Sequence, residues 1–196
     1  MKRLFLAIAA LLLAPAVSFA QQNGKNTNSG VEIWYEGELN VGYGFGGTLS
    51  MSGISGDADY GRPFVETVHG VRITPYAFVG GGLGIQYATD KAWKTAMMPI
   101  FLNVKGLYPV TKNLAPYVSV DLGYSACLTS SSGELDEMGL DIKGGFYASC
   151  GVGLTYKRLN FGLGLQHQGG KLADKETGVG VNASVNSFFL KVGIKF

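Results

Sequence analysis

The sequence predicts an all-β fold, an eight-stranded antiparallel up-and-down transmembrane β-barrel. Three observations support it. Of the 196 residues, 30 are glycine and only 15% are charged, and hydrophobic and polar residues alternate with a period of two through eight segments. No apolar run reaches the ~20 residues that a transmembrane helix needs. We therefore expect strands to carry any membrane crossing.

The alternating segments are separated by polar, glycine-rich connections. The first segment alternates most cleanly, because acidic residues and Asn40 occupy one face and apolar or aromatic residues the other. The last segment repeats the pattern, with Lys191 and Lys195 opposite an apolar face. The expected strands span 31–46, 62–72, 76–88, 97–109, 116–129, 141–156, 161–170 and 186–196.

Aromatic residues and loop lengths indicate which face is outside. Aromatic residues of the apolar faces gather at the two ends of the strands, as they do at the two interfaces of a membrane barrel. They are Tyr35, Tyr108, Tyr156, Phe161 and Phe196 at one end, and Tyr43, Phe45, Tyr87 and Tyr124 near the other. Long and short connections alternate strictly, as expected when short turns face the periplasm. A soluble barrel with an apolar core and a small ligand remains the alternative fold.

The beginning of the chain predicts export. Residues 1–20 have a positive start, a short apolar core and small residues before the expected cleavage site, which is typical of a signal peptide. Residues 21–30 form a polar leader, and 31–196 form the barrel domain. Removing Lys2 and Arg3 leaves fourteen basic and fourteen acidic residues, so a nucleic-acid partner is not expected. We expect insertion into the cell outer membrane, with its lipid as a partner.

The polar faces carry five acidic and five basic residues, which would point into the lumen. Unpaired charges in a poorly hydrated interior are costly, so we expect a charge-neutralised, packed lumen. A narrow, gated ion or proton path is the alternative use of the same charges. The predicted network consists of Glu32, Glu36, Glu38, Glu66, Asp121, Arg72, Lys105, Lys143, Lys191 and Lys195.

Several segments resemble the small outer-membrane β-barrel domain family. They are 69–84 (HGVRITPYAFVGGGLG), 31–46, 99–104, 116–125 and the ending VGIKF. The resemblance covers nearly the whole chain after the signal peptide and implies an OmpA- or OmpX-like barrel in the outer membrane. The ending is similar to the signal that barrel-assembly machinery binds. That signal would comprise Phe188, Leu190, Val192, Ile194 and Phe196.

The sequence contains no arrangement of residues that indicates catalysis or a cofactor. Cys127 and Cys150 are expected on opposite faces and far apart along one hairpin, so both should be free thiols. The histidines, His69 and His167, lack the spacing of a metal site or a nucleophile–base pair, so we expect no enzyme, no metal and no cofactor.

A structural or surface-interaction role is therefore the leading functional hypothesis. Two acidic loop segments, 47–61 and 130–140, could bind a partner, a surface polymer or calcium weakly, or could simply be solvated. The alternatives are a narrow channel or transport path for small solutes or small hydrophobic molecules, and a lipid-modifying enzyme. The partner of the surface loops stays unknown at this stage.

Overall fold

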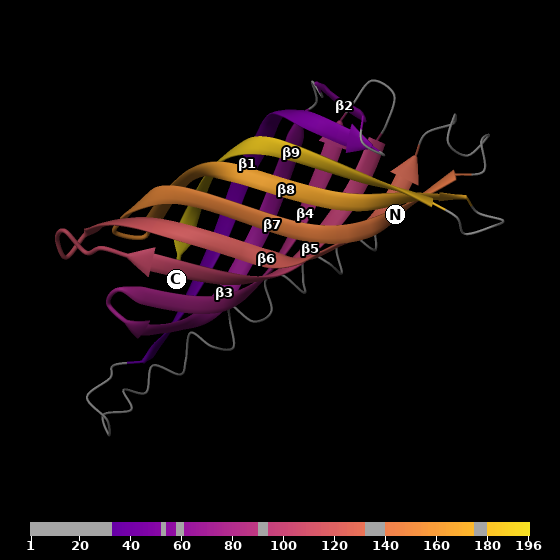
Figure 1. Cartoon of the computed structure of the whole chain (residues 1–196). Coiled ribbons are helices and arrows are strands. Elements are labelled where there is room, and N and C mark those ends of the chain that lie inside the picture. The colour runs from indigo at the N-terminus through magenta and orange to yellow at the C-terminus, as the bar shows by residue number, and fades with distance from the viewer. Residues whose placement is uncertain (1–32, 52–53, 58–60, 90–93, 132–139, 175–179) are drawn as a thin grey trace.

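The computed structural model describes residues 33–51, 54–57, 61–89, 94–131, 140–174 and 180–196. They form a closed antiparallel barrel whose wall consists of eight strands (Figure 1). A ninth, short strand lies at one end of the barrel beside the first. The strands are β1 (Trp34–Met51), β2 (Ile54–Asp57), β3 (Arg62–Thr74), β4 (Ala77–Thr89), β5 (Lys94–Leu107), β6 (Leu114–Ser131), β7 (Leu140–Tyr156), β8 (Leu159–Asp174) and β9 (Gly180–Lys195).

Hydrogen bonding between the first and last wall strands closes the barrel. Each wall strand pairs with the next in the chain, and β1 pairs with β9 from Glu38–Lys195 to Met51–Ala183. The chain ends also pair across this seam, since Gly37 and Phe196 exchange two backbone hydrogen bonds of 2.9 Å. The predicted eight-stranded, up-and-down topology is confirmed. Within the described residues, no helix is long and apolar enough to cross a membrane.

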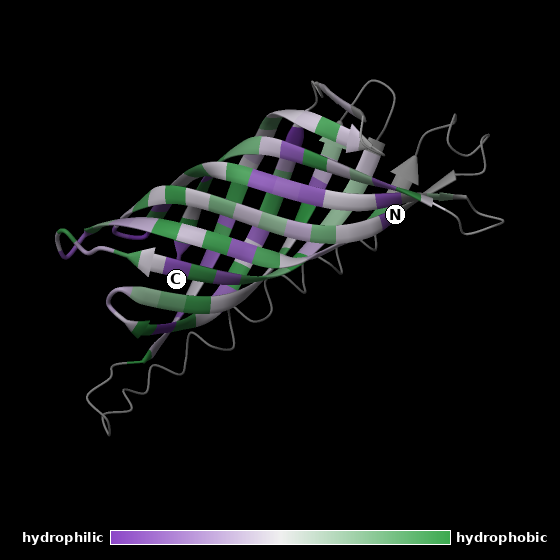
Figure 2. Ribbon diagram, in the orientation of Figure 1, coloured by the Kyte–Doolittle hydropathy of each residue, from purple (hydrophilic) through white to green (hydrophobic). Residues whose placement is uncertain are grey.

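The two faces of the wall have opposite character. Asn40, Asn103 and Asp121 are among the buried side chains that point inward, whereas Leu102, Leu122 and many other large apolar side chains are exposed on the outside. Figure 2 shows the resulting alternation of hydrophilic and hydrophobic residues along each strand. A soluble barrel would bury its apolar face, so the alternative fold is wrong and the outward apolar face is that of a transmembrane barrel.

The strands extend farther than predicted at the end of the long connections, which we call the long-loop end. β1 continues to Met51, where β2 pairs with it, and β8 and β9 add residues 171–174 and 180–185. A bulge between Phe45 and Thr48 precedes the extension of β1. Gly46 supplies the positive φ of 58° there, a conformation that glycine adopts without cost.

The strands are staggered round the wall. We follow paired residues from strand to strand once round the barrel, starting at Leu107 on β5. The path returns to β5 at Met97, which lies ten residues (107 minus 97) nearer the long-loop end. Such a stagger accompanies the strand tilt that closing a barrel requires. We call the section of this path from β5 to β1 the stagger row. It comprises Leu107, Tyr117, Gly153, Gly162, Lys191 and Gly42.

One predicted lumen residue lies outside the lumen. Lys143 is exposed and lies directly opposite exposed Lys171. The register of β7 and β8 shifts between Gly144 and Tyr147, so the strict alternation is broken there and the extra residue turns Lys143 to the other face. The prediction for Lys143 is therefore wrong. Glu32, the proposed signal peptide and leader, and the acidic segment 132–139 lie outside the described residues.

Candidate functional site

A buried ion pair at the centre of the lumen joins opposite parts of the wall. Glu38 on β1 accepts a hydrogen bond from Lys105 on β5, and each residue is only 2% exposed. Asn160 on β8 donates a second hydrogen bond to Glu38 at 3.1 Å. The Lys105 ammonium also lies 5.2 Å from the ring centroid of Tyr117, within cation–π range. Glu38 therefore links three strands through one carboxylate.

A second ion pair lies beside the first and crosses the seam region. Lys191 on β9 donates to Glu66 on β3 at 2.8 Å, and both side chains are buried. Asn40 donates to Glu66 at 3.2 Å and lies 3.5 Å from Glu38, so one amide connects the two carboxylates. The two ion pairs consequently form a single hydrogen-bonded network.

A third group lies toward the end of the short turns, which we call the short-turn end. Glu36 contacts Arg72 at 3.0 Å and Lys195 at 2.9 Å. The Arg72 guanidinium lies 5.7 Å from the ring centroid of Trp34. Because Lys195 lies on β9, its ion pair with Glu36 joins the last strand of the wall to the first.

Asp121 is held by neutral hydrogen-bond donors. It accepts hydrogen bonds from Asn103 and from Ser149, the latter at 2.5 Å. The structure thus places eight of the ten predicted lumen residues, all except Glu32 and Lys143, on the inner face. It also adds a buried cation that the sequence reasoning missed, Arg62. Arg62 could have been found from its position four residues before Glu66, because residues an even number apart on a strand share a face.

The lumen toward the long-loop end contains amides and hydroxyls. Gln166 on β8 donates to Gln86 on β4 at 2.8 Å across the interior. Buried Gln168 follows Gln166 on the same face of β8, and buried Ser187 lies directly opposite Gln166 on β9. The sequence analysis did not identify these residues, because uncharged polar side chains on an inward face give little signal above the alternation itself.

Aromatic rings of the lumen lie directly on glycines of neighbouring strands. A Cβ atom added to Gly162 would lie 2.7 Å from the Tyr117 hydroxyl, and one added to Gly164 would lie 2.9 Å from the Phe189 ring. Tyr117 also donates to the Phe161 carbonyl at 3.2 Å. A narrow barrel has room for large rings only where the facing wall lacks side chains. These glycines therefore allow the rings to fill the interior.

The outer wall carries the predicted apolar and aromatic residues. Tyr108 and Tyr156 are exposed near the short-turn end, and Tyr43 and Tyr124 are exposed farther up the wall. The five residues of the predicted C-terminal assembly signal are all outward and exposed: Phe188, Leu190, Val192, Ile194 and Phe196. Their placement is that of a lipid-facing row on β9.

His69 belongs to a polar group on the outside of the wall. Its Nδ1 lies 2.5 Å from the Tyr35 hydroxyl and its Nε2 lies 2.9 Å from the Thr67 hydroxyl. Thr67 donates its single hydroxyl proton to the Glu38 carbonyl at 3.1 Å. All three side chains are satisfied when Tyr35 donates to the imidazole and the imidazole donates to Thr67. That arrangement leaves no free base for Thr67.

The cysteines lie apart, as predicted. Cys150 is directly opposite Val120 on β6 and is exposed, whereas Cys127 lies seven positions farther along that strand (127 minus 120). Neither forms a disulfide. His167, the second histidine, donates a 2.7 Å hydrogen bond from its Nδ1 to the Asn186 Oδ1 on the outer wall. Within the part of the chain that the structure describes, no group of three or more potential metal ligands occurs.

Solved structures of outer-membrane proteins share the fold of this chain at low sequence identity. The outer membrane protein AlkL, solved in lipid bilayers, is 16% identical with a TM-score of 0.51, covering 89% of this chain and 93% of that one. This chain has the fold of the small outer-membrane β-barrels. OprG from Pseudomonas aeruginosa is 11% identical (TM-score 0.47, covering 82% and 96%), and the outer membrane enzyme PagL is 13% identical (0.46, covering 79% and 97%). No family model and no curated relative matches the chain.

Proposed function

We propose that this chain is an integral protein of the outer membrane of a Gram-negative envelope, with a plugged lumen and its short turns in the periplasm. It works through its outer wall and its long-loop end. The resemblance of its ending to an assembly signal supports insertion by the barrel-assembly machinery, with outer-membrane lipid as its surroundings. The observation that carries the proposal is the buried, hydrogen-bonded ion network beneath an apolar outer wall.

The network supports a structural use of the lumen charges over conduction. A permeation path needs water or mobile side chains along its length, whereas Glu38, Lys105, Glu66 and Lys191 bind one another and are buried. Eight strands enclose an interior that side chains just fill. The rings that lie on glycine complete this filling.

The length of the strands supports a role for the long-loop end. β1 and β6 have 18 residues each, about eight more than a tilted strand needs to cross the hydrocarbon layer. The outward side chains near the long-loop end include Lys143 and Lys171, and polar residues there suit water better than lipid. The wall therefore projects beyond the membrane and presents β2 and the long-loop ends of its strands to the outside.

Two measurements test the proposal. The chain without residues 1–20 is folded in detergent and run on a gel with and without boiling. The two samples should migrate differently, because closed membrane barrels resist unfolding in detergent. The protein should fractionate with outer membranes. Inserted in a planar bilayer, it should give no steady conductance above that of the lipid alone. A single band in the soluble fraction would contradict the membrane placement, and a stable open channel would contradict the plugged lumen.

A further inference from the structure

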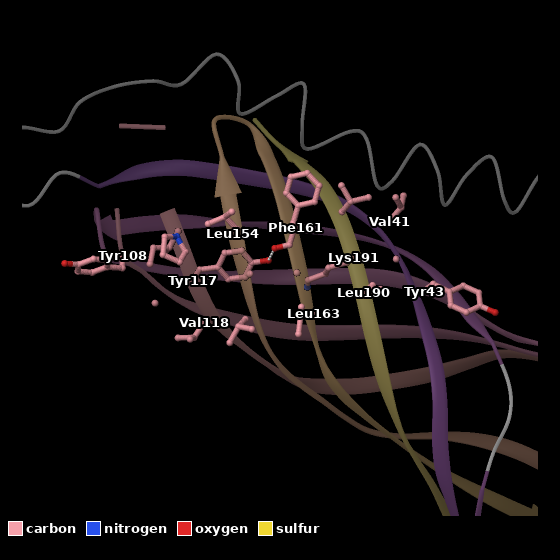
Figure 3. Close-up of a pocket in the computed structure, with 18 residues that line it drawn as sticks. Val41, Tyr43, Tyr108, Tyr117, Val118, Leu154, Phe161, Leu163, Leu190 and Lys191 are labelled. Atoms are coloured by element: carbon pink, nitrogen blue, oxygen red, sulfur yellow. Dashed lines mark hydrogen bonds between the residues drawn. The ribbon is translucent and has the colours of Figure 1, made fainter. Parts of the chain in front are cut away.

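An apolar groove crosses the outer wall along the stagger row. It has a volume of about 1070 Å³ and runs from β5 and β6 at the short-turn end to the middle of β1. Its floor is the backbone of the stagger row. Figure 3 shows side chains that flank it, among them Leu154 and Phe161 on one side and Leu163 and Leu190 on the other.

The mouth of the groove lies at the short-turn end of β5. Gly106 occupies a flanking position there and points outward beside Val118. A Cβ atom added to Gly106 would meet only Val118, at 3.4 Å. The absent side chain leaves the groove open next to Tyr108, which is exposed at the same edge.

The groove has the dimensions of one acyl chain in one leaflet. Six strands with five spacings of ~4.8 Å give a path of about 24 Å along the wall. At the ~45° tilt typical of transmembrane strands this path rises about 17 Å, close to the ~15 Å of half a hydrocarbon core. The groove rises from the short-turn end because the stagger row climbs toward the long-loop end from β5 to β1.

Three cations lie in two short turns at the end of the barrel where the groove begins. Lys112 belongs to the turn between β5 and β6, and Lys157 and Arg158 form the turn between β7 and β8; all three are exposed. The two turns touch, because the Lys157 N–H donates to the Asn113 carbonyl at 2.7 Å. The short turns 75–76, 108–113 and 157–158 contain no aspartate or glutamate. This edge is therefore positively charged next to an apolar groove.

The conformation of Lys157 adds an independent observation. Its φ of 54° lies in the left-handed region, which costs free energy for a residue with a side chain. Glycine would occupy this two-residue turn without that cost. Backbone strain of this kind concentrates at functional positions, where it holds a side chain in place. Here the residue is a cation in the turn between β7 and β8, and its ammonium lies 5.6 Å from the ring centroid of Tyr156.

We propose that the groove and its cationic edge bind one anionic diacyl phospholipid of the periplasmic leaflet. Lys112, Lys157 and Arg158 bind the phosphate, and an acyl chain lies in the groove from Gly106 toward β1. Basic residues at a membrane surface attract anionic lipids, and basic pockets beside apolar walls bind their head groups. This inference rests on the proposed membrane orientation, with the short turns in the periplasm.

Native mass spectrometry tests the head-group part. The folded protein in neutral detergent is mixed with equal amounts of palmitoyl-oleoyl phosphatidylglycerol and phosphatidylcholine. We expect phosphatidylglycerol adducts to dominate about 100-fold, since each of the three cations should contribute about five-fold. The double variant Lys157→Gln/Arg158→Gln should reduce this preference about 25-fold, or about five-fold for each cation. The matched control Lys143→Gln/Lys171→Gln, which removes two exposed neighbouring cations at the long-loop end, should keep it within two-fold.

The groove is tested with Gly106→Leu. The leucine points outward into the mouth and leaves the lumen untouched, so it should reduce adducts of both lipids several-fold and equally. Equal binding of the two lipids by the unchanged protein, an equal effect of the two double variants, or unchanged lipid binding in Gly106→Leu would overturn the inference. Gel migration before and after boiling, on the same sample, separates these outcomes from a failure of the proposed membrane barrel.

Lys157→Gly separates lipid binding from stability. Glycine removes both the charge and the left-handed strain, so the midpoint of thermal unfolding in detergent should rise by about 2–4 °C. The preference for phosphatidylglycerol should fall about five-fold in the same variant. A fall in both quantities, or a preserved preference, would contradict the role assigned to Lys157.

Discussion

The two halves of the lumen solve the same packing problem with different chemistry. The half toward the short-turn end is held by ion pairs, in which Glu38 meets Lys105 and Glu66 meets Lys191. The half toward the long-loop end contains the buried cation Arg62, but its hydrogen bond across the lumen joins two neutral groups, Gln166 and Gln86. Both halves connect strands that are not neighbours in the wall.

The difference shows where the barrel depends on exact partners. A buried charge that loses its partner is left uncompensated, whereas a buried amide that loses one hydrogen bond loses a smaller, dipolar interaction. The ion pairs also gather on β1, β3 and β9, around the seam that closes the barrel. The charged half therefore determines which strands must meet, and the neutral half mainly fills space.

The largest expected effect comes from breaking the central ion pair. Lys105→Met leaves Glu38 buried without its cation, which should lower the free energy of unfolding by about 3–5 kcal/mol. Urea unfolding in lipid vesicles, followed by tryptophan fluorescence, measures the change. The double variant Glu38→Gln/Lys105→Met removes both charges and keeps an acceptor for Asn160. It should return to within about 1 kcal/mol of the unchanged protein. Additive losses would show that the two residues do not act as a pair.

A smaller effect is expected where an aromatic ring of the charged half lies on glycine. Gly153→Ala places a methyl group against both the Phe161 carbonyl and the Tyr117 ring, and such overpacking should cost about 2 kcal/mol in the same unfolding assay. Gly106→Ala is the matched control, since its methyl group points outward and meets only Val118. Its effect should stay below about 0.5 kcal/mol. Equal losses of stability in the two variants would mean that the change from glycine to alanine in a strand, and not crowding at Gly153, sets the cost.

The smallest of the three effects is expected in the neutral half. Gln166→Leu removes the donor to Gln86 and should cost about 1 kcal/mol. The double variant Gln86→Leu/Gln166→Leu leaves no unpaired amide and should recover most of this loss. If Gln166→Leu proved as costly as Lys105→Met, the contrast between the two halves would be incorrect.

The alternation of residue types was sufficient to predict the faces of the barrel. Because side chains on a strand alternate strictly, the inward placement of Glu36, Glu38 and Lys191 followed once a membrane barrel was inferred. Their partners could not be predicted. The stagger of the strands decides that Glu38 meets Lys105 instead of a residue on β9, and the spacing of residues within a segment does not contain that stagger.

The errors lie where the simple alternation stops. The bulge before Tyr147 turns Lys143 outward, and an inserted residue of this kind cannot be distinguished from its neighbours in a run of glycines. The extensions of β1, β8 and β9 lie toward the long-loop end, where glycine and small polar residues are frequent and resemble those of a connection. Arg62 was missed because it stands at the first position of its strand, where connection and strand are hard to separate.

The pairing of Glu66 with Lys191 has a consequence for the order of assembly. The acidic residues of the network lie early in the chain, on β1 and β3, whereas Lys191 and Lys195 arrive only with the final strand. A sheet that ended at β8 would hold carboxylates facing an interior that contains too few cations for them. Half-built intermediates are therefore penalised electrostatically, and the last strand relieves the penalty in one step. The lumen charges therefore make closure of the barrel more cooperative, and partly inserted forms are disfavoured by their own electrostatics.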